Sequence, residues 1–265
     1  MRYISSISYT APKDRRFPFN IAAFRSSFDL ELAPLTVFVG ENMLGKSTLL
    51  KTLALAMNLE FIGGPIEQKY SFEAARILAP FLTTRLTRRP KYGFFFNPED
   101  YHEYVSSPQR YKNTLFSEMQ KEREELGDTV FNILSESMNF PLQNMKRRYG
   151  SNLLTCSHGE STLRILASRI HSNGLLLIDE PELGLHIKST FALISLMKEM
   201  LDSNKSQFIL STHSPIIAGI PGAFVYEINS DRIRQIEYKS IDLYKLTKEY
   251  LDNPNSHSSP DLPPD

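Results

Sequence analysis

Two glycines separated by four residues stand in the segment VGENMLGKSTLL, which spans residues 39–50. Gly40 and Gly45, followed at once by Lys46 and Ser47, match the pattern of a loop that binds phosphate groups. In such a loop, backbone N–H groups and the positive end of the next helix dipole face a negatively charged ligand. The competing interpretation is an ordinary glycine-rich turn before a helix, but a lysine and a serine at this spacing favour phosphate chemistry.

The residues of this loop have separate expected roles. Lys46 would reach the β- and γ-phosphates of a nucleotide, Ser47 would ligate Mg²⁺, and Thr48 would contact the α-phosphate. The backbone around the phosphates would come from Gly40, Glu41, Asn42, Met43, Leu44 and Gly45.

An acidic pair follows a second apolar segment, in LLLIDEPELGLH (175–186). Asp179 ends the apolar run, and ligands of α/β folds bind at the carboxyl ends of buried strands. Asp179 would therefore hold Mg²⁺, directly or through water, and Glu180 would polarise an attacking water molecule. Taken alone, the segment also fits an acidic turn that caps the next helix.

His213 stands after a third apolar segment, in STHSP (211–215). A histidine at this place can contact a γ-phosphate and sense its loss. The competing interpretation is a histidine at a strand end that is hydrogen bonded to a neighbouring carbonyl group.

The segment SHGES (157–161) precedes the helical run STLRILASRI. Ser157, Gly159 and Glu160 would place a hydroxyl and free N–H groups at a helix N-terminus, which is an anion site without a lysine. The competing interpretation is a capping box, with Ser157 as the N-cap and Glu160 three positions later.

These groups need a framework that brings them together, and the apolar pattern predicts one. LTVFV (35–39), GLLLI (174–178) and SQFIL (206–210) are continuous apolar runs, which are typical of strands buried on both faces. KSTFALISLMKEML (188–201) has the length and pattern of a covering helix. Buried strands that alternate with helices predict an α/β fold with a mostly parallel central sheet.

Further segments are expected around this sheet. They are an N-terminal antiparallel β part from residues 2–9 and 28–32, a short strand GFFF (93–96), a helical subdomain over about residues 100–157, a hairpin from 223–228 and 233–238, and a helix over 241–251. We expect one domain over residues 1–252 and a disordered tail over 253–265, which is rich in Pro, Ser and Asp.

Composition narrows the class of protein. The chain has 265 residues, and 30 basic side chains balance 30 acidic ones, which argues against a wholly basic DNA-coating protein. The single cysteine, Cys156, excludes an internal disulfide and fits a reducing compartment. No apolar run approaches the length of a membrane span, and the N-terminus lacks the apolar core of a signal peptide. We therefore expect a cytoplasmic location.

The order of these motifs resembles that of ABC-type ATPases. The phosphate loop (Walker A), a helical insert, SHGES, the strand that ends in Asp-Glu and then THS follow one another along the chain. The chain resembles small stand-alone ATPases of this class, often labelled AAA family ATPases, which are relatives of SMC and RecF-type ATPase heads. TRRPKYGFFF (87–96) and SHGES (157–161) together are specific to this group, and the resemblance covers nearly all of the chain except the tail.

This resemblance implies a P-loop NTPase fold, ATP and Mg²⁺ as cofactors, and slow hydrolysis. It also implies a homodimer with two sandwiched ATP molecules, in which Ser157 and Gly159 complete the site of the other protomer. Asn97 corresponds to the glutamine that lies beside Mg²⁺ and the attacking water in ABC-type ATPases. Glu99 is the alternative candidate for that role. Gly184 and Leu185 would cross the dimer interface. Phe17 or Phe19 could pack on adenine, although the residues by themselves favour two core aromatics.

The chain departs from the family at Met43 and Leu44, because the usual loop reads GENGSGKS. If residue 43 needs a positive φ, methionine costs about 1–2 kcal/mol relative to glycine. We expect the site to tolerate that cost and to bind ATP. Met43 could also contact the partner protomer or narrow the γ-phosphate side.

Other functions remain open at this point. An ATP-gated sensor that controls an effector such as a nuclease or toxin, and a DNA-associated ATPase, both use such a domain. One basic run is formed by Arg85, Arg88, Arg89 and Lys91, and another by Lys146, Arg147 and Arg148. Such runs are usually solvated faces, but they could bind nucleic acid, and Arg88 or Arg89 could instead lie near the nucleotide. The absence of sustained heptads between Asn97 and Ser157 argues against a long coiled-coil arm.

Overall fold

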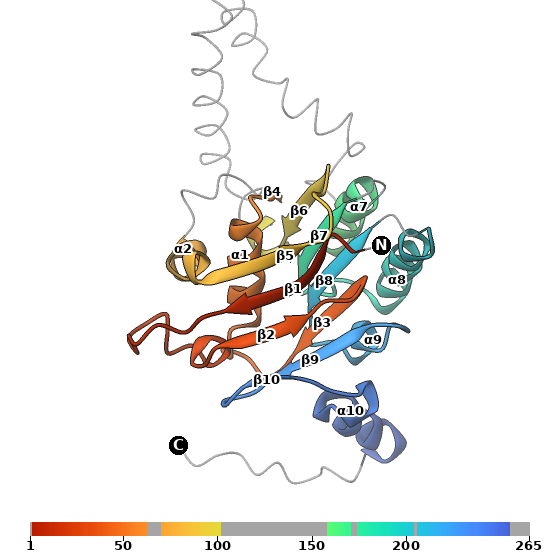
Figure 1. Cartoon of the computed structure of the whole chain (residues 1–265). Coiled ribbons are helices and arrows are strands. Elements are labelled where there is room, and N and C mark those ends of the chain that lie inside the picture. The colour runs from red at the N-terminus through yellow and green to blue at the C-terminus, as the bar shows by residue number, and fades with distance from the viewer. Residues whose placement is uncertain (1, 63–69, 102–157, 171–173, 204–205, 255–265) are drawn as a thin grey trace, which may run out of the picture.

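A seven-stranded sheet forms the centre of the protein (Figure 1). The computed structural model describes residues 2–62, 70–101, 158–170, 174–203 and 206–254. The strand order is β10-β9-β3-β8-β7-β6-β4, and all neighbours are parallel except β9 and β10. The strands are β3 (Leu35–Val39), β4 (Glu60–Ile62), β6 (Gly93–Phe96), β7 (Leu175–Asp179), β8 (Gln207–Ser211), β9 (Phe224–Ile228) and β10 (Ile233–Gln235).

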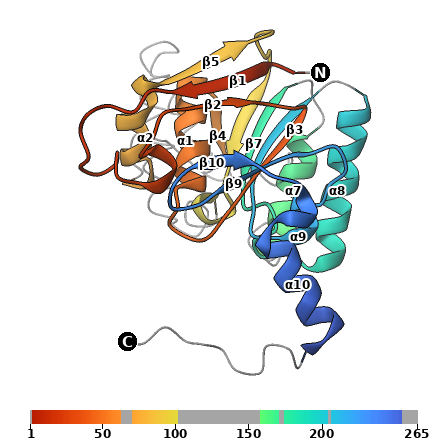
Figure 2. The same cartoon turned by 60° about the horizontal axis from the view of Figure 1, so that its bottom comes forward.

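A smaller antiparallel sheet covers part of one face of the central sheet (Figures 1 and 2). Its order is β2-β1-β5, formed by β1 (Ile4–Tyr9), β2 (Phe28–Glu31) and β5 (Leu82–Leu86). This sheet confirms the expected N-terminal antiparallel part. β5 was not anticipated, because LTTRL is largely polar and exposed and gives only a weak strand pattern.

Helices cover both faces of the central sheet (Figure 2). α1 (Lys46–Ala56) and α2 (Glu73–Leu78) lie on the side of the small sheet, whereas α7 (His158–Arg169), α8 (Ile187–Asp202) and α9 (Pro215–Ala218) lie on the other. α10 (Asp242–Asp252) follows at the end of the described chain. Short 3-10 helices span Ala22–Phe24, Tyr70–Phe72, Ala79–Phe81 and Tyr238–Ser240.

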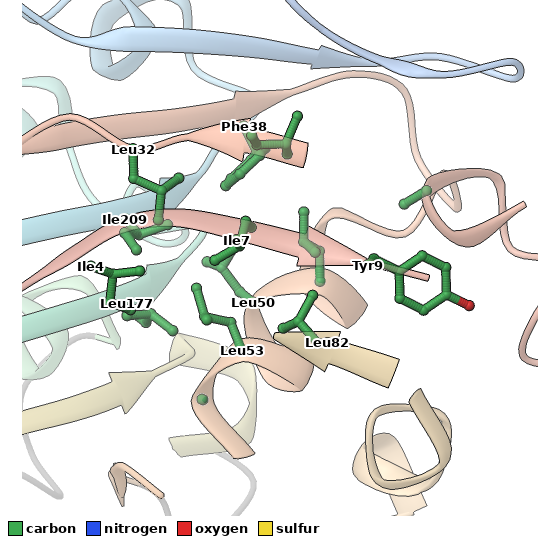
Figure 3. Close-up of a cluster of buried hydrophobic side chains, with 14 of the residues drawn as sticks. Ile4, Ile7, Tyr9, Leu32, Phe38, Leu50, Leu53, Leu82, Leu177 and Ile209 are labelled. Carbon is green, nitrogen blue, oxygen red and sulfur yellow. The ribbon is translucent and has the colours of Figure 1, made fainter. Parts of the chain in front are cut away.

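The alternation of side chains along the buried strands builds two apolar cores. Leu177 of β7 and Ile209 of β8 point to the side of β1 and α1, where they pack with Ile7, Leu50 and Leu53 (Figure 3). Their chain neighbours, which include Leu176, Ile178 and Leu210, pack with α7 and α8 on the other side. Since successive residues of a strand face opposite sides, one apolar run can fill both cores.

The expected α/β fold with a mostly parallel sheet is confirmed, and β3, β6, β7, β8, α1, α8, α10 and the hairpin of β9 and β10 lie within a few residues of their expected positions. β4 and α2 were not anticipated. The expected helical subdomain and the tail fall almost wholly outside the described residues. Within the described part of the chain, none of the helices combines the length and the apolar character that a membrane-spanning segment needs.

Candidate functional site

The loop between β3 and α1 has the backbone that its glycines permit. Gly40 has a φ of 146° and Gly45 a φ of 102°, both in a region that residues with a Cβ rarely adopt. A Cβ at Gly40 would lie 2.3 Å from the carbonyl oxygen of Ile228, and one at Gly45 would lie 2.5 Å from Cγ2 of Ile21. Both conformation and space therefore require glycine at these positions.

Met43 and Leu44 occupy the two unusual positions of the loop in different ways. Met43 has a φ of 63° and a side chain that is 97% exposed, so the anticipated positive φ is present and the side chain packs against nothing substantial. Leu44 is half-buried against the apolar core of α1, and its carbonyl oxygen accepts a hydrogen bond from the N–H of Ala23. Leu44 thus anchors the loop, whereas Met43 projects from it.

The side chain of Lys46 is hydrogen bonded to the backbone of its own loop. Its Nζ donates hydrogen bonds to the carbonyl oxygens of Gly40 (2.9 Å) and Glu41 (2.7 Å). Burial lowers the pKa of Lys46, and the negative charges of Glu180 and Asp179 oppose that effect. The lysine of the loop and the acids after β7 therefore act on one another electrostatically across the sheet edge.

Asp179 is fully buried at the end of β7 and is held by two neighbouring strands. The amide Nδ2 of Asn97 donates to one carboxylate oxygen at 2.9 Å, and the hydroxyl of Ser211 donates to the other. The pairing register explains both contacts, because Phe96 lies opposite Ile178 and Ser211 lies opposite Asp179. Neighbouring parallel strands are about 4.8 Å apart, so side chains at their ends meet.

Asn97 is fixed from its other side as well. Its Oδ1 accepts a hydrogen bond from the N–H of Asp100 at 2.9 Å, which makes Asn97 the N-cap of the helical turn that starts at Pro98. Glu99, the rival candidate, has an exposed side chain in the same turn. The structure thus places Asn97, and not Glu99, against Asp179.

Glu180 lies in a strained turn beside Asp179. Its φ of 49° is in the left-handed region, which is costly for a residue with a Cβ and is concentrated at functional sites. Partial burial raises the pKa of the Glu180 carboxyl group, and the charges of Asp179 and Glu182 raise it further. A raised pKa makes this carboxylate a better proton acceptor than an exposed glutamate.

His213 reaches Glu180 from the end of β8. Its Nε2 lies 3.6 Å from Oε1 of Glu180, which is close but longer than a hydrogen bond. Burial lowers the pKa of His213 and the positive charge of Lys46 lowers it further, both of which favour the neutral imidazole. The interpretation of His213 as a histidine held by a neighbouring carbonyl group finds no such contact among the described residues.

Two further side chains of this site, Ser211 and Glu182, were not anticipated from the sequence. Ser211 ends a buried strand, so its position beside Asp179 could have been inferred only from the strand order. Glu182 follows Glu180 by two residues, and its Oε1 accepts hydrogen bonds from the Thr212 hydroxyl (2.6 Å) and the His213 N–H (2.7 Å). The sequence signal for Glu182 was the third acid in DEPEL.

The donor set suits a metal ion that arrives with phosphate. No group of three or more His, Cys, Asp or Glu side chains in the described part of the chain could hold a metal alone. Mg²⁺ is usually bound through one or two protein oxygens plus phosphate and water. Asp179 and the half-buried Ser47, at the start of α1, supply such oxygens.

Some expected residues lie outside the described site. Ser157 is not among the described residues, whereas Gly159 and Glu160 belong to the first turn of α7, which begins at His158 and so three residues before the expected run. Gly184 and Leu185 follow Glu182 in an exposed to half-exposed turn.

The two candidate aromatic residues for adenine differ in exposure. Phe19 is buried and packs edge-on against Phe81 at 5.4 Å, so it is a core residue. Phe17 is 64% exposed, and the segment that follows it packs on the phosphate loop through Ile21 and Ala23.

The first basic run lies at the opposite end of the sheet. The N–H of Arg88 donates to the carbonyl oxygen of Tyr3, and the N–H of Tyr3 donates to Gln207, the first residue of β8. The candidate site lies at the last residue of β8, about 13 Å away along a five-residue strand. The backbone of Arg88 therefore lies at the end of the sheet away from the phosphate loop of its own protomer. Lys146, Arg147 and Arg148 fall outside the described residues.

Comparison with known proteins agrees with the chemistry of these residues. Residues 154–218 match the sequence model of the AAA ATPase domain, which is well under half of the chain and includes Asp179, Glu180 and His213. This match confirms the resemblance to ATPases that the motifs indicate. No curated protein of known function matches the chain at a significant level.

Several solved structures are similar in outline. A protein described as an inward-facing metal-chelate type ABC transporter is 18% identical with a TM-score of 0.49, covering 91% of this chain and 85% of its own. A dimeric ATP-binding cassette in a post-hydrolysis state with ADP and Pi is 15% identical (TM-score 0.46; 89% and 100% covered). A protein described as a cobalt transport ATP-binding protein is also 15% identical (TM-score 0.42; 89% and 80% covered). At this level of similarity they decide neither activity nor partners.

Proposed function

We propose that this protein binds ATP with Mg²⁺ and hydrolyses it slowly as an ABC-type ATPase. The observation that carries the proposal is the meeting of three groups at one edge of the sheet. The phosphate loop with Lys46 follows β3, Asp179 ends β7 and Glu180 follows it, and His213 follows β8, which lies between β3 and β7.

In this mechanism, the loop N–H groups and Lys46 bind the phosphates. Lys46 would exchange its hydrogen bonds with the Gly40 and Glu41 carbonyl oxygens for bonds to phosphate oxygens. Ser47 and Asp179 would hold Mg²⁺, which supplies charge neutralisation of the phosphates when bound. Asn97 orients the Asp179 carboxylate through the bond between them.

Glu180 would accept a proton from the attacking water. Its raised pKa supports this role, and the neutral His213 beside it can donate a hydrogen bond to a γ-phosphate oxygen. The charge of Glu180 acts on Lys46 of the phosphate loop, so this carboxylate is close enough to the loop to serve a water molecule that attacks a bound γ-phosphate.

The active unit that we propose is a homodimer with ATP between its protomers. Met43 is 97% exposed at the phosphate loop, and Leu183 and Ile187, in the segment that follows the acidic pair, are also exposed. In the proposed dimer these side chains would contact the partner protomer. Ser157 and Gly159 would complete the site of the other protomer.

The decisive experiment is size-exclusion chromatography of Glu180→Gln with and without Mg-ATP. Removing the proton acceptor should stop turnover but preserve binding, so the dimer should accumulate with Mg-ATP and not with EDTA. Lys46→Ala is the matched control, because it removes the phosphate-binding ammonium and should abolish nucleotide binding and the shift in size. A Glu180→Gln protein that stays monomeric in both conditions would remove the dimer from the proposal.

No feature of the described residues favours the ATP-gated sensor or the DNA-associated ATPase. The exposed basic residues Arg85, Arg88, Arg89 and Lys91 lie away from the site, as on an ordinary solvated face.

A further inference from the structure

Glu182 connects the two loops that carry the hydrolytic side chains. Its Oε1 accepts one hydrogen bond from the Thr212 hydroxyl and another from the backbone N–H of His213. Glu182 belongs to the loop after β7 and its two donors belong to the loop after β8. The bonds therefore cross from one strand end to the next.

The backbone near Glu182 is fixed by two consecutive turns. The N–H of Leu183 donates to the carbonyl oxygen of Glu180 at 3.0 Å, and the N–H of Leu185 donates to that of Glu182 at 2.9 Å. Pro181 stands at the second position of the first turn, where its fixed φ is favourable. The direction of the Glu182 side chain is thus set by the same turn that holds Glu180.

The loop on the other side is equally constrained. Thr212 Oγ1, besides donating to Glu182, accepts the N–H of Ser214 at 2.9 Å. The Ser214 hydroxyl oxygen in turn accepts the N–H groups of Ile216 (3.3 Å) and Ile217 (3.4 Å) and caps α9. The backbone of His213 is held between these two anchored residues.

The two carboxylate oxygens of Glu182 differ in their contacts. Oε2 is buried and has no hydrogen-bond partner among the described residues. A buried carboxylate with one unused oxygen is costly, and burial raises the pKa of this group. The contacts of Glu182 are therefore concentrated in the two bonds of Oε1.

We propose that Glu182 is a positioning residue that holds His213 against Glu180 as one hydrolytic unit. It acts through its Oε1 bonds to Thr212 and the His213 N–H and does not touch the nucleotide. This inference rests on the proposed ATPase function for its kinetic consequences but not for its structural ones. Without Glu182, the loop after β8 can shift relative to the turn after β7, and the 3.6 Å approach of His213 to Glu180 is lost.

The kinetic test compares three replacements of Glu182. Glu182→Ala removes both bonds and should lower kcat at least about tenfold while the Kd for ATP changes less than about threefold, because the phosphate loop is untouched. Glu182→Gln keeps an oxygen in the place of Oε1 and should recover most of that loss. Glu182→Asp keeps the charge but shortens the reach, and should resemble the alanine variant.

Three results would overturn the proposal. Equal losses in the glutamine and alanine variants would mean that the charge matters and not the bonds. An alanine variant with unchanged kcat would mean that the bonds do not matter. Loss of ATP binding together with kcat would mean a general structural role. Glu237→Ala, at an exposed glutamate far along the chain, is the control for nonspecific effects.

A second measurement separates this inference from the proposed function. Hydrogen exchange of the His213 amide, measured by NMR without nucleotide, should accelerate about tenfold or more in Glu182→Ala and stay protected in Glu182→Gln. Unchanged protection in the alanine variant contradicts the inference even if ATP hydrolysis is normal. Absence of hydrolysis in the wild type, with the expected exchange pattern, contradicts only the proposed function.

Discussion

Residues in the left-handed region of backbone conformation lie on both sides of the candidate site. Met43 in the phosphate loop has a φ of 63°, and Glu180 after β7 has a φ of 49°. Such conformations cost about 1–2 kcal/mol for a residue with a Cβ. At Glu180 this conformational cost falls on the residue that we propose as the proton acceptor. The Met43 side chain is exposed, so no packing of that side chain within the protomer offsets the backbone strain.

Replacing Met43 by glycine should therefore stabilise the isolated protein. We expect Met43→Gly to raise the free energy of unfolding by about 1 kcal/mol, because the strain disappears and an exposed side chain is lost. Met43→Ala keeps the Cβ and should bring no gain. Urea denaturation of the nucleotide-free protein measures both. A glycine variant less stable than wild type would mean that Met43 contributes contacts that outweigh its strain.

Two elements around the site are linked by a buried ion pair. Nζ of Lys51 in α1 lies 3.2 Å from a carboxylate oxygen of Asp100, with both side chains about 90% buried, and it lies 4.9 Å from the ring centre of Phe72. The N–H of Asp100 binds Asn97, which in turn binds Asp179. The helix that starts at the phosphate loop is thus connected to the turn that orients Asp179.

Breaking this ion pair should cost more than removing an exposed one. Lys51→Met leaves Asp100 without its buried cation, so we expect a loss of about 3 kcal/mol in the free energy of unfolding. The double variant Lys51→Met, Asp100→Leu should recover part of the loss. Lys248→Met, which breaks the exposed pair with Asp252, should change nothing measurable. Thermal and urea unfolding test the series, and equal effects of Lys51→Met and Lys248→Met would refute the argument.

The molecule as a whole is two sheets joined at one end, and Gln207 joins them. Its Nε2 donates to the carbonyl oxygens of Ile4 (2.8 Å) and Ala33 (3.0 Å), and its Oε1 accepts the N–H groups of Tyr3 (2.7 Å) and Ile4 (2.9 Å). Gln207 is fully buried in the first position of β8. The same strand carries the joint between the sheets at its amino end and Ser211 of the candidate site at its carboxyl end.

Gln207→Leu should weaken the contact between the sheets. The replacement removes four hydrogen bonds to buried backbone groups, and we expect a loss of at least about 3 kcal/mol in the free energy of unfolding. Gln235→Leu, at an exposed glutamine of the edge strand β10, is the matched control and should have little effect. Chemical denaturation followed by circular dichroism compares the two. A neutral Gln207→Leu would show that apolar packing alone joins the sheets.

The sequence by itself determined the features that depend on neighbours in the chain. The spacing of Gly40, Gly45 and Lys46, the apolar runs that become β3, β7 and β8, and the acids after β7 are local patterns, because backbone conformation and strand burial follow from adjacent residues. These patterns predicted the mostly parallel sheet, and they predicted the phosphate loop with a strand before it and a helix after it. They could not predict β5, whose exposed polar residues form a strand only by pairing with β1.

Tertiary structure alone decided which distant residues meet. The order of β3, β8, β7 and β6 brings Asn97 and Ser211 to Asp179 and Glu182 to His213, and it sends Arg88 to the other end of the sheet. The physical reason is that pairing between parallel strands depends on the packing of both faces and on the register between segments far apart in the sequence. No local pattern records that register, so only the folded chain shows how the carboxyl edge is assembled.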